Sequence, residues 1–365
     1  MAEQCASVVG MTAHTETGAQ GIDAYYAGLG EHEVAPLWKA LRGLLPKEPK
    51  SRAVPHVWRY ETMRGLLMRA GELVSAEEAE RRVLMLVNPG LDGAAAATTN
   101  VYAGLQLVLP GEIAPAHRHG AGAVRFIIEG EGAHTTVDGE RTIMAPGDLV
   151  LTPNSSWHDH GNQSDSPVIW LDALDLPMVN AIEGNYFELD EEQQEQELAK
   201  PVDASRRLYA HGRLNPVWQQ PTGQFPSPLI NYPWSRTEQV LREAVDVDAG
   251  SPYDGVVFEY ANPLTGGSVL PTLGCFVQQL AAGLRTDAHR HTSSAVYQVV
   301  SGSGRTIVDG TTLEWTTNDT FVVPGWAVHE HVNDGDEPAT LFSVTDDPVI
   351  RALGLYREEA VERQS

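Results

Sequence analysis

Eight of the thirteen histidines in this 365-residue chain fall into two copies of one pattern, a His-x-His triplet followed later by another. They are His117, His119, His158 and His160 in the first copy, and His289, His291, His329 and His331 in the second. The first histidines of the two copies are 172 positions apart, and the third histidines are 171 apart. This nearly constant offset predicts an internal duplication in which each half brings three or four imidazoles together.

The spacing within each triplet decides where the side chains point. Successive residues of a β-strand face opposite sides, so His117 and His119 share one face, as do His158 and His160. If the two strands face each other across a barrel, their imidazoles meet inside it. Neutral imidazole is a ligand for iron, zinc, copper and nickel. Because polar groups in a core need partners, eight matched histidines favour metal binding over eight ordinary half-buried side chains.

Short strands must position these histidines, and the chain has two regions rich in them. Frequent glycine and proline between apolar runs are typical of sandwiches and barrels. Matching Asp-Gly pairs at 138–139 and 309–310 predict tight hairpin turns in both regions. The expected strands of the first region are Leu105–Leu109, Val124–Ile128, Thr142–Ala145, Leu149–Thr152 and Val168–Leu171. We expect a partly helical extension at 1–95, a first β-domain at 96–180, a connector at 181–255, a second β-domain at 256–350 and a tail at 351–365.

A local helix signal precedes the first β-domain. The segment Ser75-Ala76-Glu77-Glu78 has the spacing of a capping box and predicts a short helix through Arg82. The apolar run at 83–87 then predicts a buried strand, ended by Asn88-Pro89-Gly90.

Composition narrows the class of protein. A formal net charge of -24 disfavours nucleic acid and anionic membranes as partners, and an anionic ligand would need local positive charge in its pocket. Two cysteines, Cys5 and Cys275, cannot form a disulfide framework and suit a reducing compartment. The chain has no basic and apolar leader and no run of about 18 apolar residues. We therefore expect a cytoplasmic protein.

The two halves differ at a position that should face inward. Arg125 of the first half is replaced by Tyr297 in the second, and Asp172 is replaced by Ser343. Arginine offers a planar fork that binds a carboxylate through two hydrogen bonds. An exposed arginine is the more common case, but Arg125 lies within the apolar run 123–128. Only the first half therefore has the polar groups expected of a site for a small anion.

The glycines, prolines and histidines of each half resemble the two motifs of the cupin family. The residues that carry the resemblance in the first half are Gly111, His117, His119 and Gly130, then Gly147, Pro153, His158 and Asn162. The resemblance implies a small β-barrel in each half, and therefore a mainly β bicupin of two jelly-roll barrels. Cupins usually have a glutamate where this chain has Ala123 and Ala295, and a motif glycine is replaced by Ser155.

The missing glutamate changes the charge of the expected metal site. A divalent ion held by three neutral histidines keeps its full charge of +2 and leaves about half of an octahedron open. Such a site favours an anion that chelates through two oxygens, with room for dioxygen beside it. A site that kept the glutamate, as in oxalate-processing bicupins, would be less favourable to a dianion.

Longer stretches are similar to the gentisate 1,2-dioxygenases, over about 55–350 of the chain. The stretches are Glu77–Leu84, Ala114–His119, Arg125–Gly130, Thr152–Asn162 and His289–Ser294. The resemblance implies a ring-cleaving enzyme in which His117, His119 and His158 bind Fe(II), with O2 as co-substrate. A hydroxybenzoate would chelate the iron through its carboxylate and ortho hydroxyl. Gentisate would yield maleylpyruvate.

The resemblance also implies roles for side chains around the iron. Arg125 would anchor the substrate and His160 would assist by hydrogen bonding or proton transfer, although a purely structural hydrogen bond is an equal alternative for His160. The expected pocket lining is Arg81, Tyr102, Gln106 and Asp172, with Gly104 leaving space on the same strand face. Whether His289, His291 and His329 bind a second metal is open, and we expect at most an accessory site there. Relatives of this family suggest a homotetramer.

Several other functions fit the same residues. Relatives that accept salicylate, substituted salicylates or 1-hydroxy-2-naphthoate would use the same iron and the same chelation. Tyr102 could bond a 5-hydroxyl, which favours gentisate. From other classes, a non-catalytic bicupin that binds a small ligand, a metal-dependent isomerase and a thiol-type dioxygenase are the alternatives. None of these would need an inward arginine beside a site free of carboxylate ligands.

Overall fold

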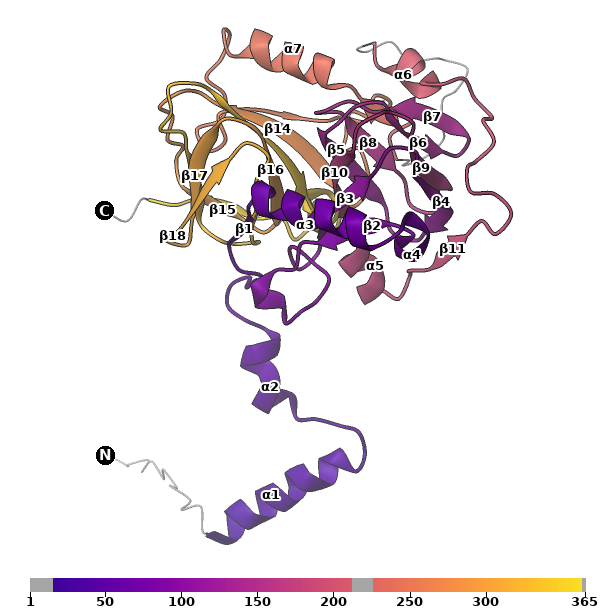
Figure 1. The fold of residues 1–365 in the computed structure, drawn as a ribbon. Coiled ribbons are helices and arrows are strands. Elements are labelled where there is room, and N and C mark those ends of the chain that lie inside the picture. Colours follow the sequence, from indigo (N-terminus) through magenta and orange to yellow (C-terminus); the bar gives the residue numbers. More distant parts are fainter. Residues whose placement is uncertain (1–15, 212–225, 363–365) are drawn as a thin grey trace, which may run out of the picture. The chain divides into compact units, whose positions relative to one another are not determined.

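The computed structural model describes residues 16–211 and 226–362 and divides into two compact units, Met1–Pro49 and Lys50–Ser365. The described part of the first unit consists of helices α1 (Glu16–Gly30) and α2 (Leu37–Leu44) (Figure 1). No residue of α2 is buried. None of the helices in the described ranges has both the length and the apolar character needed to cross a membrane.

Four antiparallel sheets build the second unit, and they form two barrels of one six-stranded and one five-stranded sheet each. In the first barrel the larger sheet has the order β12 (Asn231–Tyr232), β8 (Leu149–Thr152), β5 (Ala123–Glu129), β10 (Val168–Leu174), β3 (Tyr102–Val108) and β2 (Arg82–Met85). The smaller sheet has the order β11 (Phe187–Leu189), β4 (Ile113–His119), β9 (His158–Asn162), β6 (Ala133–Val137) and β7 (Glu140–Ile143).

The second barrel repeats this arrangement (Figure 1). Its larger sheet has the order β1 (His56–Trp58), β19 (Thr320–Val323), β16 (Ala295–Ser301), β21 (Ala339–Thr345), β14 (Gly274–Leu280) and β13 (Val256–Glu259). Its smaller sheet has the order β18 (Thr311–Thr316), β17 (Ser303–Val308), β20 (His329–Val332), β15 (His289–His291) and β22 (Glu358–Ala360). The remaining elements of this unit are α3 (Tyr60–Leu73), α4 (Ala76–Ala79), the 3-10 turn η1 (Pro89–Leu91), α5 (Leu176–Ala181), α6 (Ala204–Tyr209), α7 (Trp234–Ala244) and α8 (Asp347–Ala352). The predicted mainly β architecture with two barrels is confirmed.

Turn chemistry fixes the matching hairpins of the two barrels. Asp138 and Gly139 join β6 to β7 with φ of 44° and 74°, and Asp309 and Gly310 join β17 to β18 with φ of 47° and 81°. Two consecutive positive φ angles are the geometry of a type I′ turn, which Asp-Gly adopts at low cost. The predicted tight turns are therefore confirmed in both halves.

The prediction that the two histidine strands face each other across a barrel is wrong. β4 and β9 are hydrogen-bonded neighbours in one sheet, with His117 directly opposite His158. The second barrel pairs His289 with His329 in the same way. Directly opposed residues of neighbouring antiparallel strands have Cα atoms about 4.5–5.5 Å apart, so the imidazoles meet on one face of a ladder.

The predicted capped helix is shorter than expected. Ser75 accepts a hydrogen bond from the backbone N–H of Glu78, at 3.1 Å, as a capping box requires. The helix ends at Ala79 rather than at Arg82, because Glu80 adopts a φ of 50° and breaks the turn. Arg82 then begins β2, in which Arg82 is buried, Val83 and Leu84 are partly buried and Met85 is exposed, whereas the sequence predicted a buried strand.

Short strands from outside the two β-rich regions complete the sheets. β1 pairs with β19 of the second barrel, and β22 pairs with β15. β11 and β12 pair with β4 and β8 of the first barrel. These four strands lie in the segments that the sequence assigned to an extension, a connector and a tail. The boundaries proposed for those segments stay a prediction.

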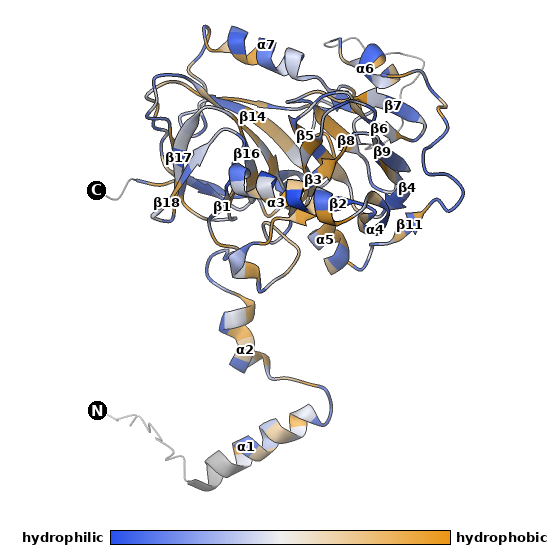
Figure 2. Ribbon diagram, in the orientation of Figure 1, coloured by the Kyte–Doolittle hydropathy of each residue, from blue (hydrophilic) through white to orange (hydrophobic). Residues whose placement is uncertain are grey.

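One apolar core runs between the two barrels. Its buried side chains come from the larger sheets of both, and Figure 2 shows apolar residues along β5 and β8. Phe126 of β5 stacks on Phe342 of β21, with ring centroids 4.2 Å apart and planes inclined by 14°. A stacked aromatic pair contributes about 0.5–1.5 kcal/mol beyond its buried area. The barrels therefore share a packed interface and not only a connecting segment.

We predict that Phe342→Ala lowers the free energy of unfolding by about 3–5 kcal/mol, because it leaves a cavity between the barrels. Urea unfolding followed by tryptophan fluorescence and by circular dichroism measures the change. The matched control is Phe258→Ala on the edge strand β13, where the ring is 38% exposed. Equal losses in both variants would show that the aromatic stack adds nothing.

Candidate active site

Three imidazoles converge on one point of the first barrel. β4 supplies His117 and His119, and β9 supplies His158. The ring of His158 lies 3.9 Å from that of His117 and 4.8 Å from that of His119, between centroids. One nitrogen of each ring lies within 4.8 Å of a nitrogen of the other two. This is the predicted ligand set, brought together by strand pairing.

Backbone carbonyls fix the orientation of each ring. Because a carbonyl only accepts, each Nδ1 must donate, which leaves each Nε2 as a free acceptor. Within the described ranges, the buried Nε2 of His158 has no hydrogen-bond partner. The Nδ1 atoms of His117, His119 and His158 lie 2.8, 2.7 and 2.9 Å from the carbonyl oxygens of Pro115, Ala121 and Ser156.

The protonation state of the three rings suits a metal. Burial is the main cause that lowers the pKa of His117 to about 2 and that of His119 to about 4. Burial also holds the pKa of His158 well below its ordinary value. Neutral imidazoles with free Nε2 atoms are the form that binds transition metals. The donor set therefore fits a first-row divalent ion.

A cavity of about 320 Å³ adjoins the three histidines. It has basic, polar and apolar walls, which come from the sheet strands and from the segment that leads into β11. Its lining comprises Arg81, Val83, Met85, Tyr102, Gln106, His117, His119, Ala121, Arg125, His160, Asp172, Leu174, Leu176, Asn185, Tyr186 and Phe187. All the predicted pocket residues except Gly104 contribute to this lining.

Arg125 and Asp172 form a buried ion pair on neighbouring strands. They lie opposite each other in the β5–β10 ladder, and Nε of Arg125 lies 3.1 Å from Oδ1 of Asp172. Arg125 also donates from Nη1 to Oγ1 of Thr152 at 2.5 Å, and Nε1 of Trp170 donates to Oδ2 of Asp172 at 3.0 Å. Both charged side chains are buried, with exposures of 3% and 5%. Asp172 therefore holds the guanidinium in place in a setting where an isolated charge would be unstable.

Arg81 adds a second cation to the same cavity. Its Nε and Nη2 atoms are buried and have no hydrogen-bond partner in the part of the chain that the structure describes. Burial lowers its pKa to about 10, so the guanidinium stays charged at neutral pH. The group lies over the ring of Phe187, 4.9 Å from its centroid. Two guanidinium groups without a second carboxylate give the cavity a positive wall in a protein of net negative charge.

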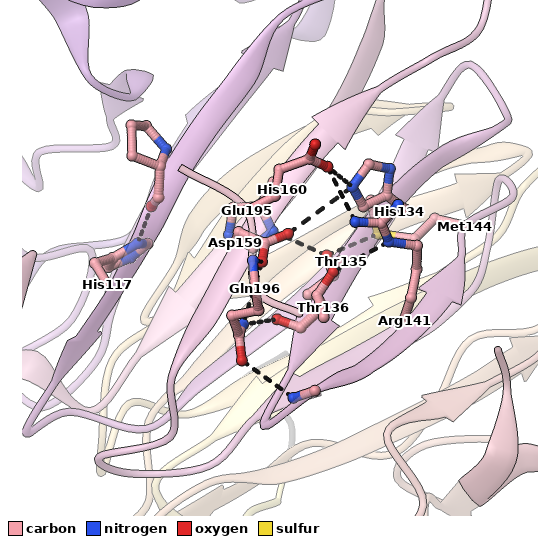
Figure 3. A network of polar contacts seen from close by, with 12 residues as sticks. His117, His134, Thr135, Thr136, Arg141, Met144, Asp159, His160, Glu195 and Gln196 are labelled. Carbon is pink, nitrogen blue, oxygen red and sulfur yellow. Dashed lines mark hydrogen bonds and ion pairs between the residues drawn. The ribbon is translucent and has the colours of Figure 1, made fainter. Parts of the chain in front are cut away.

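His160 points into the barrel beside the triad. Its Nδ1 lies 2.9 Å from Oγ1 of Thr135, whose hydroxyl donates to the sulfur of Met144 (Figure 3). Thr135 therefore accepts from His160, and Nε2 of His160 is left as an acceptor. Burial holds the pKa of His160 well below its ordinary value. Nδ1 of His160 makes a structural hydrogen bond to Thr135, and Nε2 can still accept a hydrogen bond. A structural role and a role in substrate binding are therefore compatible for this residue.

The outer face of β9 is held by a segment of the connector. Asp159 points away from the barrel, opposite to the neighbouring histidines, and accepts from the backbone N–H of Gln196 at 2.8 Å. Nε2 of His134 lies 3.2 Å from Oε1 of Glu195, and Nη2 of Arg141 donates to the same oxygen at 3.0 Å (Figure 3). This network ties the connector to the strand that carries two of the inward histidines.

The strand β3 lies between β10 and β2 and adds two polar side chains to the cavity lining, Tyr102 and Gln106. In the described residues, Nε2 of Gln106 is buried and has no partner. The expectation that Gly104 leaves space is wrong: a Cβ there would lie 2.7 Å from Cγ1 of Val83 and 2.8 Å from the hydroxyl oxygen of Tyr102. The absent side chain is replaced by the Tyr102 hydroxyl, which burial keeps protonated by raising its pKa.

The sequence did not identify the wall formed by the connector. Asn185, Tyr186 and Phe187 line the cavity because β11 pairs with β4, with Phe187 opposite His119. The sequence feature that could have indicated this wall is the aromatic pair Tyr186 and Phe187, just before an acidic run. A pairing between segments this far apart cannot be inferred from local alternation.

The lowered histidine pKa values predict that the metal-free protein loses stability on acidification. In the unfolded chain these groups titrate near 6.5, so below that pH the unfolded state binds protons that the folded state excludes. The free energy of unfolding therefore falls from about pH 6.5 towards the folded values of about 4 and 2 for His119 and His117. Thermal midpoints in excess chelator, measured at steps from about pH 7.5 to 5.5, test the sign.

His119→Gln removes one titrating group. The slope of the unfolding free energy against pH should therefore decrease by the equivalent of up to one proton. A midpoint that stays constant or rises on acidification would contradict the prediction.

Comparison with known proteins relates both halves of the chain to one domain family. Residues 104–174 and 276–345 match the cupin domain. Gentisate 1,2 dioxygenase 1 of Aquipseudomonas alcaligenes is 44% identical over 92% of this chain and 95% of its own length. 5-Aminosalicylate 1,2-dioxygenase of Comamonas sp is 44% identical over 93% of this chain and 90% of its own. A solved structure of salicylate 1,2-dioxygenase from Pseudoaminobacter salicylatoxidans, an adduct with gentisate, superposes with a TM-score of 0.89 at 35% identity and covers 98% of both chains.

Proposed function

The chain belongs to the gentisate 1,2-dioxygenase family of bicupin ring-cleaving dioxygenases, and on that basis we propose that it opens the ring of gentisate to give maleylpyruvate. Its substrate class is an aromatic hydroxy acid, and its chemistry uses a metal cofactor and dioxygen. The observation that carries the proposal is the pair of buried guanidinium groups, of Arg81 and Arg125, beside three neutral imidazoles. That combination attracts a chelating organic anion.

The proposed metal is Fe(II), held by His117, His119 and His158. No carboxylate belongs to this donor set, because Ala123 stands where cupins usually have glutamate. The ion would keep its full positive charge and its affinity for anionic oxygen ligands. When bound, the iron supplies the redox chemistry that couples dioxygen to opening of the ring.

Arg125 and Arg81 are proposed to bind the substrate carboxylate. Hydrogen bonds to a charged group are worth about 1.5–3 kcal/mol each, and a guanidinium can bind a carboxylate through two of them. Asp172 is a positioning residue, because its contact is with Arg125 through the Nε atom. The unused hydrogen-bonding capacity of Arg81 is available to the same anion.

His160 is proposed to bind the phenolic oxygen of the substrate. Its ring is neutral and its tautomer is fixed by Thr135, so Nε2 is an acceptor when a phenol approaches. The same nitrogen can take the phenolic proton as the substrate binds as its anion. In that state the ring donates to the phenolate oxygen.

The polar groups of β3 favour gentisate over the alternatives. The hydroxyl of Tyr102 and the amide of Gln106 line the cavity and can bond a substituent at ring position 5. Salicylate lacks such a substituent, whereas a 5-amino group would also be satisfied, so a 5-aminosalicylate activity is the second candidate. Gly104 offers no extra space for the second ring of 1-hydroxy-2-naphthoate, because a Cβ there would already meet Val83 and Tyr102.

We predict rapid oxygen consumption with gentisate after anaerobic reconstitution with Fe(II), and slower consumption with salicylate and 1-hydroxy-2-naphthoate. An oxygen electrode and the absorbance of the ring-opened product measure the rates. Protein loaded with Zn(II) is the control, since zinc has no redox chemistry. Absence of oxygen uptake with all of these acids, despite bound iron, would contradict the proposed function and favour a binding bicupin.

Arg125→Lys should lower kcat/KM for gentisate by about 10- to 100-fold, because an ammonium cannot replace the two-pronged hydrogen bond to a carboxylate. The control is Arg64→Lys, which changes a half-exposed arginine that pairs with Glu129 outside the cavity. Steady-state kinetics of iron-loaded protein give the values. An unchanged kcat/KM in Arg125→Lys would exclude Arg125 as the carboxylate anchor.

The homotetramer implied by the family resemblance stays a prediction. Light scattering coupled to size-exclusion chromatography of the full chain tests it.

A further inference from the structure

Three groups of side chains in the described residues have metal-ligating atoms within 4.8 Å of one another. Two are the triads predicted from the sequence, which are His117, His119 and His158 in the first barrel and His289, His291 and His329 in the second. The third group is His134, Asp159 and Glu195, which the sequence did not indicate. It lies on the face of β9 opposite to the cavity, where the connector covers the strand (Figure 3).

The carboxylate of Asp159 has one satisfied oxygen and one oxygen without a partner. Oδ2 accepts hydrogen bonds from the backbone N–H and from Nε2 of Gln196, at 2.8 and 3.2 Å. Oδ1 is buried and has no hydrogen-bond partner within the ranges that the structure describes. The whole side chain is 0% exposed. A buried carboxylate oxygen without a partner is unfavourable, and a bound cation would satisfy it.

Two further ligand atoms lie close to this oxygen. Nε2 of His134 lies 3.8 Å from Oδ1 of Asp159 and 3.2 Å from Oε1 of Glu195. With ligand bonds of about 2.0–2.2 Å, neighbouring ligand atoms of a tetrahedral zinc ion lie about 3.3–3.6 Å apart. Burial and the nearby Arg141 lower the pKa of His134, so its ring is neutral at pH 7 and can present Nε2 to a metal.

The charges around the group suit a divalent cation. Nη2 of Arg141 donates to Oε1 of Glu195 at 3.0 Å. A carboxylate oxygen has two lone pairs, so this oxygen can accept from Arg141 and also bind an ion. Two carboxylates and one guanidinium leave one negative charge beside a neutral ring, and a divalent cation offsets that charge.

The second barrel satisfies the equivalent acidic residue with an arginine. Glu330 lies opposite Ile307 in the β17–β20 ladder, as Asp159 lies opposite Thr136 in the β6–β9 ladder. Both oxygens of Glu330 accept hydrogen bonds from Arg285, at 2.9 and 2.6 Å. The first barrel instead has a neutral imidazole and a free carboxylate oxygen at this place. A metal ion there would take the part that the guanidinium of Arg285 has in the second barrel.

We propose that His134, Asp159 and Glu195 bind Zn(II), which fastens the connector to the outer face of β9. One imidazole and two carboxylate oxygens are a donor set that zinc accepts. The side chain of Glu195 is 32% exposed, so water can occupy the remaining position of the ion.

The ion holds the same segment that supplies the connector wall of the cavity. The connector pairs with Ala116 of β4, whose N–H donates to the carbonyl of Gln194 at 2.8 Å and whose carbonyl accepts from Asp190 at 2.9 Å. It then reaches β9 through Glu195 and Gln196. Because the ion needs a ligand from each side, metal binding and docking of the connector stabilise each other.

Counting bound Zn(II) in the full chain tests the site. Metal-free protein is dialysed against Zn(II), passed through a desalting column and analysed for ions per chain. His134→Gln should bind one ion fewer than the natural chain. The double variant His119→Gln/His134→Gln should bind one ion fewer than His119→Gln, because the site is separate from the triad. Equal counts in either comparison would overturn the proposal, whatever the activity of the first barrel.

A pair of substitutions in the connector tests the contribution of Glu195. Glu195→Gln should weaken binding of this ion by about 10- to 100-fold. The control is Glu197→Gln, which removes the same charge from an exposed position two residues further on. Zn(II) should slow amide exchange at 194–196 in the natural chain and in Glu197→Gln, and have less effect in Glu195→Gln. Equal affinities, or equal slowing of exchange, in the two variants would contradict the proposed site.

Discussion

Burial of neutral imidazoles on two paired strands is the constraint on which the first barrel depends. β4 and β9 can bring three ring nitrogens together only if the rings face inward, and inward rings must stay uncharged. Backbone carbonyls satisfy one nitrogen of each ring, which leaves the other three for a cation. Asp159 and the connector hold the opposite face of the same strand. The metal site is therefore a property of the sheet and of the segment that covers it.

The two barrels share one arrangement of strands but have different charged residues around their histidines. Both have the same histidine ladder, and both support a further inward histidine with a threonine, His160 with Thr135 and His331 with Thr306. The charged residues that line the two cavities differ: Arg81, Arg125 and Asp172 in the first barrel, and Arg351 with Asp254, Glu259, Asp347 and Glu358 in the second. Both barrels therefore keep three converging histidines, whereas the residues around those histidines differ.

Packing between the two barrels joins them through one apolar core. The larger sheets share an apolar core, with Phe126 stacked on Phe342. Strands from outside the two repeats pair with the sheets at their edges: β1 pairs with β19, and β22 pairs with β15. Each cavity therefore lies beside a sheet, and a segment outside the repeat supplies part of its wall.

The sequence alone determined the duplication, the convergence of His117, His119 and His158, and the inward direction of Arg125, because alternation along a strand is a local property. It also determined the Asp-Gly turns, whose backbone angles depend on the two residues themselves. Tertiary structure decided that the histidine strands are neighbours, that Tyr102 fills the space at Gly104, and that Phe187 and Glu358 reach the two cavities. Those contacts join segments far apart in the chain, so they depend on packing that residue spacing does not encode.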